Sequence, residues 1–170
     1  HFSLRLAGKD ADPAEAWLEV KKISMLLEEW FADRQLYHLV GFLIWDGMDV
    51  NKLRSLAGGI RKSELKDRLK IEVVKRALGA SPPIGADAVP KWVADQLDEL
   101  AYPLRRRQIR SILLLFNLAT LLQHPQSNIR FNFESFKTEN WDIEHVRSVA
   151  SAELGSPTLQ ADWLQQAKHY

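Results

Sequence analysis

Apolar residues recur at helical spacing along most of the chain, and this pattern predicts a protein built from helices. The clearest stretch follows Asp12-Pro13-Ala14-Glu15, a capping-box start with proline at the first helical position. It predicts an amphipathic helix over residues 13–32, whose inward face consists of Trp17, Val20, Ile23, Ser24, Leu27 and Phe31. Further helices are predicted over residues 36–45, 50–57, 64–78, 90–100 and 103–122, and a last one from Ser156-Pro157.

Several of these helices carry boundary signals. Asp49 is a candidate N-cap for residues 50–57, and Ser63 for residues 64–78, which Gly79 ends. The stretch 36–45 is apolar nearly all round and predicts a short buried helix. In the helix that ends before Gly79, the apolar stripe is Leu65, Leu69, Val73 (or Ile71) and Leu78. Residues 80–89 form the most loop-like stretch, with two prolines and a glycine.

The period changes between Asn128 and Phe133, where apolar and polar residues alternate. This predicts the one strand of the chain. The expected fold class is therefore all-α: a multi-helix domain with one short β element. The expected division is a helical domain over residues 1–125 and a second domain over residues 126–170, packed on the helices.

Composition narrows the possible classes of function only a little. The chain has 170 residues, 46% of them hydrophobic and 26% charged, with a net charge of +1, so any basic surface has to be local. It contains no cysteine, which excludes disulfides and thiolate chemistry and fits a cytoplasmic location. No apolar run reaches the length of a membrane span, and nothing resembles a signal peptide. Because the first residue is His1, we expect an excised region of a longer protein.

The segment from Asn140 to Val146 carries the most specific candidate chemistry. Within it, Glu144 precedes His145, as an acidic residue precedes the first histidine of an HNH-type nuclease site. Histidine titrates near neutrality and suits a general base that activates water, while Glu144 or Asp142 is suited to hold a divalent ion, Mg²⁺ or Mn²⁺. The alternative is that His145 only caps a helix or bonds a carbonyl.

Several blocks of the chain together resemble the C-terminal region of GmrSD-type restriction endonucleases, which cut modified DNA. The resemblance covers residues 15–150. It is carried by residues 112–117, by Arg130-Phe131-Asn132-Phe133 with Lys137, by Trp141-Asp142-Ile143-Glu144-His145-Val146, and by residues 36–44, which resemble the middle helical region of the family.

The resemblance implies that His145 matches the first HNH histidine of the family and Glu144 the acidic residue before it. The later site residues of the family have no matching block, and Arg147-Ser148-Val149-Ala150 stands where the family usually has Pro or Gln. The N-terminal nucleotide-binding domain of the family is absent, and it is the expected partner within the parent chain. We therefore expect a piece of a DNA endonuclease that is inactive alone. In it the short β element leads into a partial ββα-metal (HNH-like) motif, and residues 126–170 are the truncated start of an HNH-like nuclease domain. The alternative is a non-catalytic helical module for interaction or DNA binding.

The densest basic cluster consists of Arg105, Arg106, Arg107 and Arg110, at the start of the helix 103–122. Cations there oppose the helix dipole, so phosphate binding is one explanation. Arg105 and Arg106 are expected on different faces from Arg107. The alternative is that the cluster forms salt bridges with carboxylates such as Glu64, Asp67 or Glu99.

The six tryptophans of the chain are mostly explained by packing between helices. Helical spacing places Trp17 and Trp45 inside. Only Trp141, beside the proposed nuclease residues, has a position that suggests a functional role. No paired-histidine metal motif and no phosphate-binding glycine loop is present.

Overall fold

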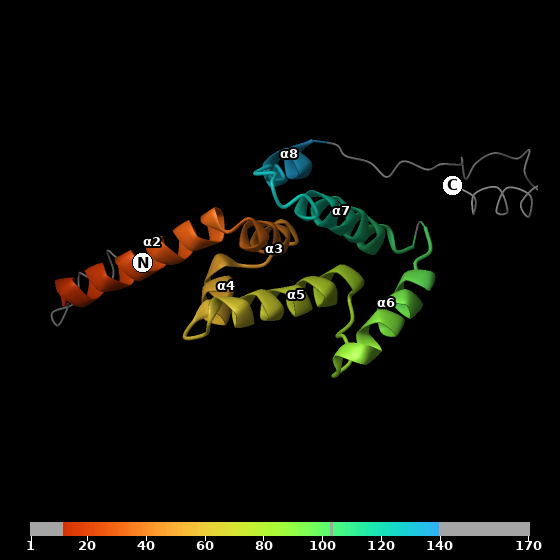
Figure 1. The fold of residues 1–170 in the computed structure, drawn as a ribbon, viewed down its shortest axis with the longest axis horizontal. Coiled ribbons are helices and arrows are strands. Elements are labelled where there is room, and N and C mark those ends of the chain that lie inside the picture. Colours follow the sequence, from red (N-terminus) through yellow and green to blue (C-terminus); the bar gives the residue numbers. More distant parts are fainter. Residues whose placement is uncertain (1–11, 103, 140–170) are drawn as a thin grey trace, which may run out of the picture. The chain divides into compact units, whose positions relative to one another are not determined.

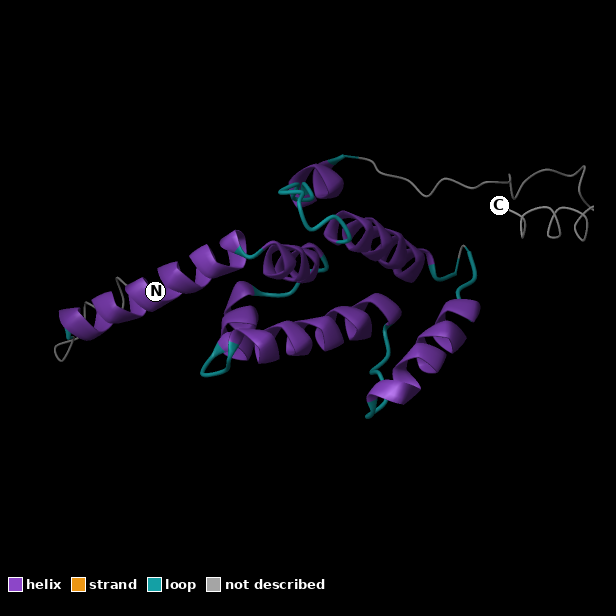
Figure 2. Ribbon diagram, in the orientation of Figure 1, coloured by secondary structure: helices purple, strands orange, loops and turns teal. Residues whose placement is uncertain are grey.

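The computed structural model of the chain describes residues 12–102 and 104–139, which belong to the unit His1–Glu139 of the chain (Figure 1). These residues form seven α-helices and one 3₁₀ helix, and none of them forms a strand (Figure 2). The predicted all-α class is therefore confirmed for this part. The elements are α2 (Pro13–Ala32), α3 (Arg34–Trp45), α4 (Val50–Ala57), α5 (Lys62–Leu78), η1 (Ala86–Ala88), α6 (Val89–Asp98), α7 (Arg106–Leu122) and α8 (Phe133–Thr138).

Aspartates begin the first three of these helices. The carboxylate of Asp12 accepts a hydrogen bond from the Ala14 amide at 2.8 Å, and that of Asp49 accepts one from the Asn51 amide at 2.8 Å. Asp33 both ends α2 and begins α3. Such caps satisfy amides that have no partner within the helix.

The start predicted at Ser63 is wrong. α5 begins at Lys62 with Arg61 at the N-cap position and no side-chain cap, so Ser63 lies within the first turn. Its end is confirmed, because Gly79 adopts a left-handed conformation with φ of 75°. α7 likewise begins later than expected, at Arg106.

The hydrophobic core surrounds α3, which contacts α2, α5, α7 and α8. Neighbours on several sides explain why α3 is apolar nearly all round: Leu36, Phe42 and Leu43 are completely buried. Burying each such side chain contributes roughly 1.5–3 kcal/mol. The stripe predicted for α5 is confirmed by the burial of Leu65, Leu69, Val73 and Leu78.

The prediction for the inner face of α2 is partly wrong. Val20 and Ile23 are half-buried, but Trp17 is 69% exposed and Phe31 63% exposed, and Trp30 is the one residue of this helix that is fully buried. The buried side is therefore rotated from the predicted stripe. Spacing alone gives the period of an amphipathic helix, but it does not say which part of the apolar face a neighbour covers.

The strand predicted over residues 128–133 is also wrong. Residues 128–132 form an irregular segment, and Phe133 begins α8. A strand needs a neighbouring strand to satisfy its backbone, and here side chains of α3 satisfy it. The Phe131 amide donates to His38 Nε2 at 3.2 Å, and the Tyr37 hydroxyl donates to the Phe131 carbonyl at 3.2 Å.

None of the helices in the described part of the chain has the length and apolar character needed to cross a membrane.

Candidate nucleic-acid interface

Three of the four arginines of the predicted basic cluster line one cleft, which we call the basic cleft. It has a volume of about 860 Å³ and lies where the end of α3, the start of α7 and the end of α8 meet. It is lined by Trp45, Asp46, Gly47, Arg106, Arg107, Arg110 and Lys137.

The start of α7 explains why these arginines lie together. Arg110 follows Arg106 by four residues and Arg107 by three, so that Arg110 is a neighbour of each on the helix surface. Arg106 and Arg107 are consecutive residues and lie on different sides of the helix, as expected, yet both line the basic cleft.

Arg105 does not line the cleft. Its guanidinium lies 3.5 Å from a carboxylate oxygen of Glu99, and both side chains are largely exposed. The salt-bridge alternative is therefore confirmed for Arg105 with Glu99. In contrast, Glu64 and Asp67 bind cations of their own helix, Arg68 at 2.6 Å and Lys70 at 3.0 Å.

Asp46 is the buried carboxylate of the basic cleft, and it pairs with two arginines. Its side chain is only 3% exposed, and its carboxylate accepts from Arg76 Nε at 2.5 Å and from Arg107 at 2.8 Å. A buried carboxylate is costly unless it is paired, so the two arginines stabilise it. Arg107 remains 73% exposed. Asp46 therefore holds one edge of the Arg107 guanidinium, and much of that side chain stays accessible to a ligand.

α8 contributes to the same cleft through Lys137 and through its contact with Arg110 of α7. The Arg110 guanidinium lies 5.0 Å from the centroid of the Phe136 ring and donates to the Phe136 carbonyl at 3.4 Å. Its buried Nε has no hydrogen-bond partner among the described residues. Four of the side chains that line the cleft are cations, and one is a carboxylate. An anion would relieve their mutual repulsion and their conflict with the dipole of α7.

A second cavity, which we call the aromatic pocket, adjoins the basic cleft and shares Trp45 and Lys137 with it. Its volume is about 440 Å³. It is lined by Leu27, Trp30, Phe31, Tyr37, Val40, Gly41, Ile44, Trp45, Val50, Phe133, Glu134 and Lys137.

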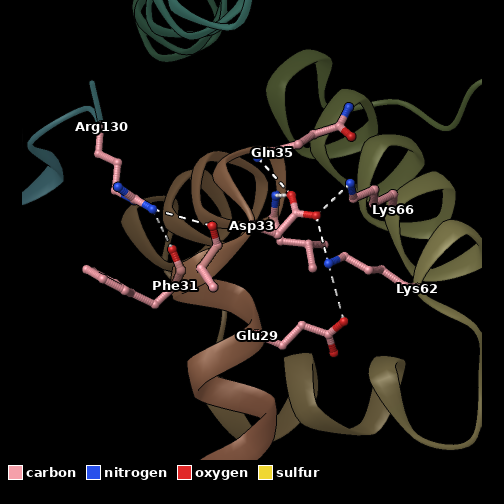
Figure 3. Close-up of polar contacts among 9 residues, drawn as sticks. Glu29, Phe31, Asp33, Gln35, Lys62, Lys66 and Arg130 are labelled. Carbon is pink, nitrogen blue, oxygen red and sulfur yellow. Dashed lines mark hydrogen bonds and ion pairs between the residues drawn. The ribbon is translucent and has the colours of Figure 1, made fainter. Parts of the chain in front are cut away.

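Polar contacts at the junction of α2 and α3 hold the wall of this pocket (Figure 3). Arg130 donates to the Phe31 carbonyl at 3.1 Å, and its guanidinium lies 4.9 Å from the centroid of the Phe31 ring. On the other side of the junction, the Asp33 carboxylate lies 2.8 Å from Lys66 and 2.9 Å from Lys62 of α5. Burial would raise the pKa of Asp33, but hydrogen bonds from Lys66, the Leu36 amide and Lys62 outweigh it and hold that pKa well below its ordinary value.

His38 has a structural role. It is 1% exposed, its Nδ1 lies 2.7 Å from the Arg34 carbonyl, and its Nε2 accepts from the Phe131 amide. Nδ1 must therefore carry the ring hydrogen and donate a hydrogen bond to the Arg34 carbonyl. Burial lowers the pKa of His38, which keeps the ring neutral and both nitrogens engaged.

The predicted nuclease residues Asp142, Glu144 and His145 lie outside the described residues, as does Trp141. Within residues 12–102 and 104–139, no group of three or more His, Asp or Glu side chains is arranged to hold a metal ion.

The sequence reasoning missed three parts of this site. Lys137 contributes to the resemblance but is not predicted as a cleft residue, and no role is predicted for Asp46. The aromatic pocket was not foreseen at all. A signal did exist for Asp46: a carboxylate directly after an apolar helix is drawn into the protein and needs cationic partners.

The chain matches no protein-family model, no curated protein and no solved structure. The resemblance to GmrSD-type endonucleases therefore stays a hypothesis drawn from the sequence.

Proposed function

We propose that this chain is part of a DNA endonuclease and that its helical unit binds the phosphate backbone of DNA in the basic cleft. The observation that supports this function best is the convergence of Arg106, Arg107, Arg110 and Lys137 on one cleft. Arginine and lysine contacts to phosphates supply most of the sequence-independent affinity of proteins for DNA.

The catalytic part of the proposal rests on the sequence. His145 acts as general base and takes a proton from the attacking water, while Asp142 and Glu144 offer the oxygen ligands that Mg²⁺ or Mn²⁺ prefers. The ion stabilises the charge that develops on the scissile phosphate. Lys137 precedes His145 by only eight residues, so the proposed DNA contact and the proposed chemistry are neighbours along the chain.

The parent protein then works in the cytoplasm against foreign or modified DNA, with an N-terminal nucleotide-binding domain as partner. A non-catalytic DNA-binding module is the second candidate, and the basic cleft supports it equally.

Binding is tested by fluorescence anisotropy of a labelled DNA duplex over a series of salt concentrations. Removing one phosphate contact should lower the slope of log K against log salt by about 0.9. We expect this loss for Arg107→Gln and for Lys137→Gln. The matched controls are Arg105→Gln, at the same end of α7 but outside the cleft, and Lys22→Gln on the exposed side of α2. Equal slopes in all five proteins would reject the basic cleft as the DNA site.

Cleavage is tested on the whole protein with plain and modified DNA in the presence of Mg²⁺ or Mn²⁺. The His145→Ala variant should lose cleavage and keep the salt-dependent binding. If it cuts as well as the unaltered protein, His145 is not the base. If neither protein cuts and both bind, the non-catalytic candidate holds.

A further inference from the structure

The aromatic pocket has the size and the walls of a site for a planar ligand. Its volume of about 440 Å³ lies within the range of small-molecule sites. Five aromatic side chains from three helices contribute to the lining, and they are Trp30, Phe31, Tyr37, Trp45 and Phe133.

The walls are held in place before any ligand arrives. The Arg130 guanidinium lies 4.9 Å from the centroid of the Phe31 ring and 5.6 Å from that of the Tyr37 ring. These two rings are nearly perpendicular, with their centroids 5.9 Å apart. The Phe133 ring lies directly against the backbone of Gly41, at a distance that leaves no room for a side chain there. A rigid aromatic pocket loses little conformational freedom when a ring stacks in it.

The neighbouring charge indicates which planar ligand the pocket takes. Trp45 and Lys137 belong both to this pocket and to the basic cleft, so a single ligand is able to occupy the two at once. The cleft, which is lined by four cations and one carboxylate, selects an anionic group. A planar ring joined to a phosphate describes a nucleotide.

We infer that the aromatic pocket receives the base of an unstacked nucleotide whose phosphate is bound in the basic cleft. The inference rests on the proposed DNA-binding function of that cleft and adds a substrate class to it. A base within a paired helix is covered on both faces, so the nucleotide belongs to a single strand or is turned out of a duplex. Stacking of a base on aromatic side chains is sequence-tolerant, because every base offers a π-face.

The test fills the pocket without disturbing the core. Ile44 of α3 lines the pocket and is 44% exposed, so Ile44→Trp places a large side chain in it at little cost to folding. Val50→Trp does the same from α4, where Val50 is 46% exposed. The matched control is Ile71→Trp on α5, at a residue that is 56% exposed and lines neither cavity. Circular dichroism and thermal melting verify that each variant folds.

The probes are a labelled single-stranded oligonucleotide and the same strand with abasic sites at its central positions. The unaltered protein and Ile71→Trp should bind the intact strand about tenfold more tightly than the abasic strand. Ile44→Trp and Val50→Trp should bind both strands with the affinity of the unaltered protein for the abasic one. The inference is overturned if binding depends on salt but shows no preference for the intact strand. It is also overturned if the preference survives in both pocket variants. In either case the basic cleft remains the proposed phosphate site. Absence of binding to either strand overturns both.

Discussion

Replacing Gly41 by alanine tests how closely α8 and the pocket wall pack against α3. A methyl group at this position would lie 2.6 Å from Cδ2 and 2.8 Å from Cζ of Phe133, and Cε2 is closer still. Carbon atoms prefer separations of about 3.5–4.0 Å, so the ring would have to move by roughly 1 Å. It has little freedom to do so, because the ring centroid of Phe131 lies 5.1 Å and that of Tyr37 6.0 Å away.

Two opposing terms set the expected magnitude. Alanine is about 1 kcal/mol better than glycine inside a helix, whereas forcing extra volume into a packed site typically costs 1–3 kcal/mol. The clash involves three atoms of a confined ring, which places the cost at the upper end of that range. We therefore expect Gly41→Ala to lower the free energy of unfolding by about 1–2 kcal/mol.

The assay is urea denaturation followed by circular dichroism, with comparison of midpoints at constant m. A double-mutant cycle with Phe133→Ala separates the two terms. Once the ring is absent, Gly41→Ala should become stabilising, by up to about 1 kcal/mol. If Gly41→Ala stabilises the protein while Phe133 is present, the ring does not lie against the backbone of α3 and the reasoning is refuted.

Substitutions at three further residues test the contacts around the same junction. Burial lowers the pKa of His38 below its ordinary 6.5, so the unfolded chain binds a proton at a pH at which the folded protein does not. Stability should be full above about pH 6.5 and fall as the pH drops towards the folded-state pKa; urea midpoints should show this slope, and His38→Gln should flatten it. Asp33 keeps its charge below its ordinary pKa of 3.8 and contributes stability above that value, which is lost as the pH falls through the folded-state pKa. Asp33→Asn should flatten the acid side of the profile and cost roughly 2 kcal/mol at neutral pH. Arg130→Gln should cost about 1 kcal/mol in thermal melts through loss of its bonds to the end of α2, and Arg130→Lys should cost less.

The sequence predicts those helix ends that depend on a residue acting on its own neighbours. Asp12 and Asp49 bond amides two residues further on, and Gly79 adopts a conformation that few other residues tolerate, so each signal is complete within a few positions. The end of α7 at Leu122 is predicted equally well, because the apolar run stops there.

The errors arise where the decisive partner is distant in sequence. The alternation of residues 128–133 is typical of a strand, but a strand forms only if another strand is available, and here α3 takes that place through His38 and Tyr37. The basic cleft shows the same limit. Arg107 reaches a carboxylate 61 residues away, and no local pattern connects Arg107 with Asp46.

The segment 127–137 connects the integrity of the fold with that of the proposed site. Arg34 of α3 donates to the carbonyls of Ser127 and Leu122, and His38 accepts from the Phe131 amide. Arg130 donates to the Phe31 carbonyl at the end of α2. These bonds fix an otherwise irregular stretch, and α8 follows it directly with Phe133 for the aromatic pocket and Lys137 for the basic cleft. If that stretch detaches, both cavities lose a wall together. Affinity for nucleic acid should therefore decrease in proportion to the fraction of molecules in which the segment is docked, even when the change is made at His38, which touches neither ligand nor cleft.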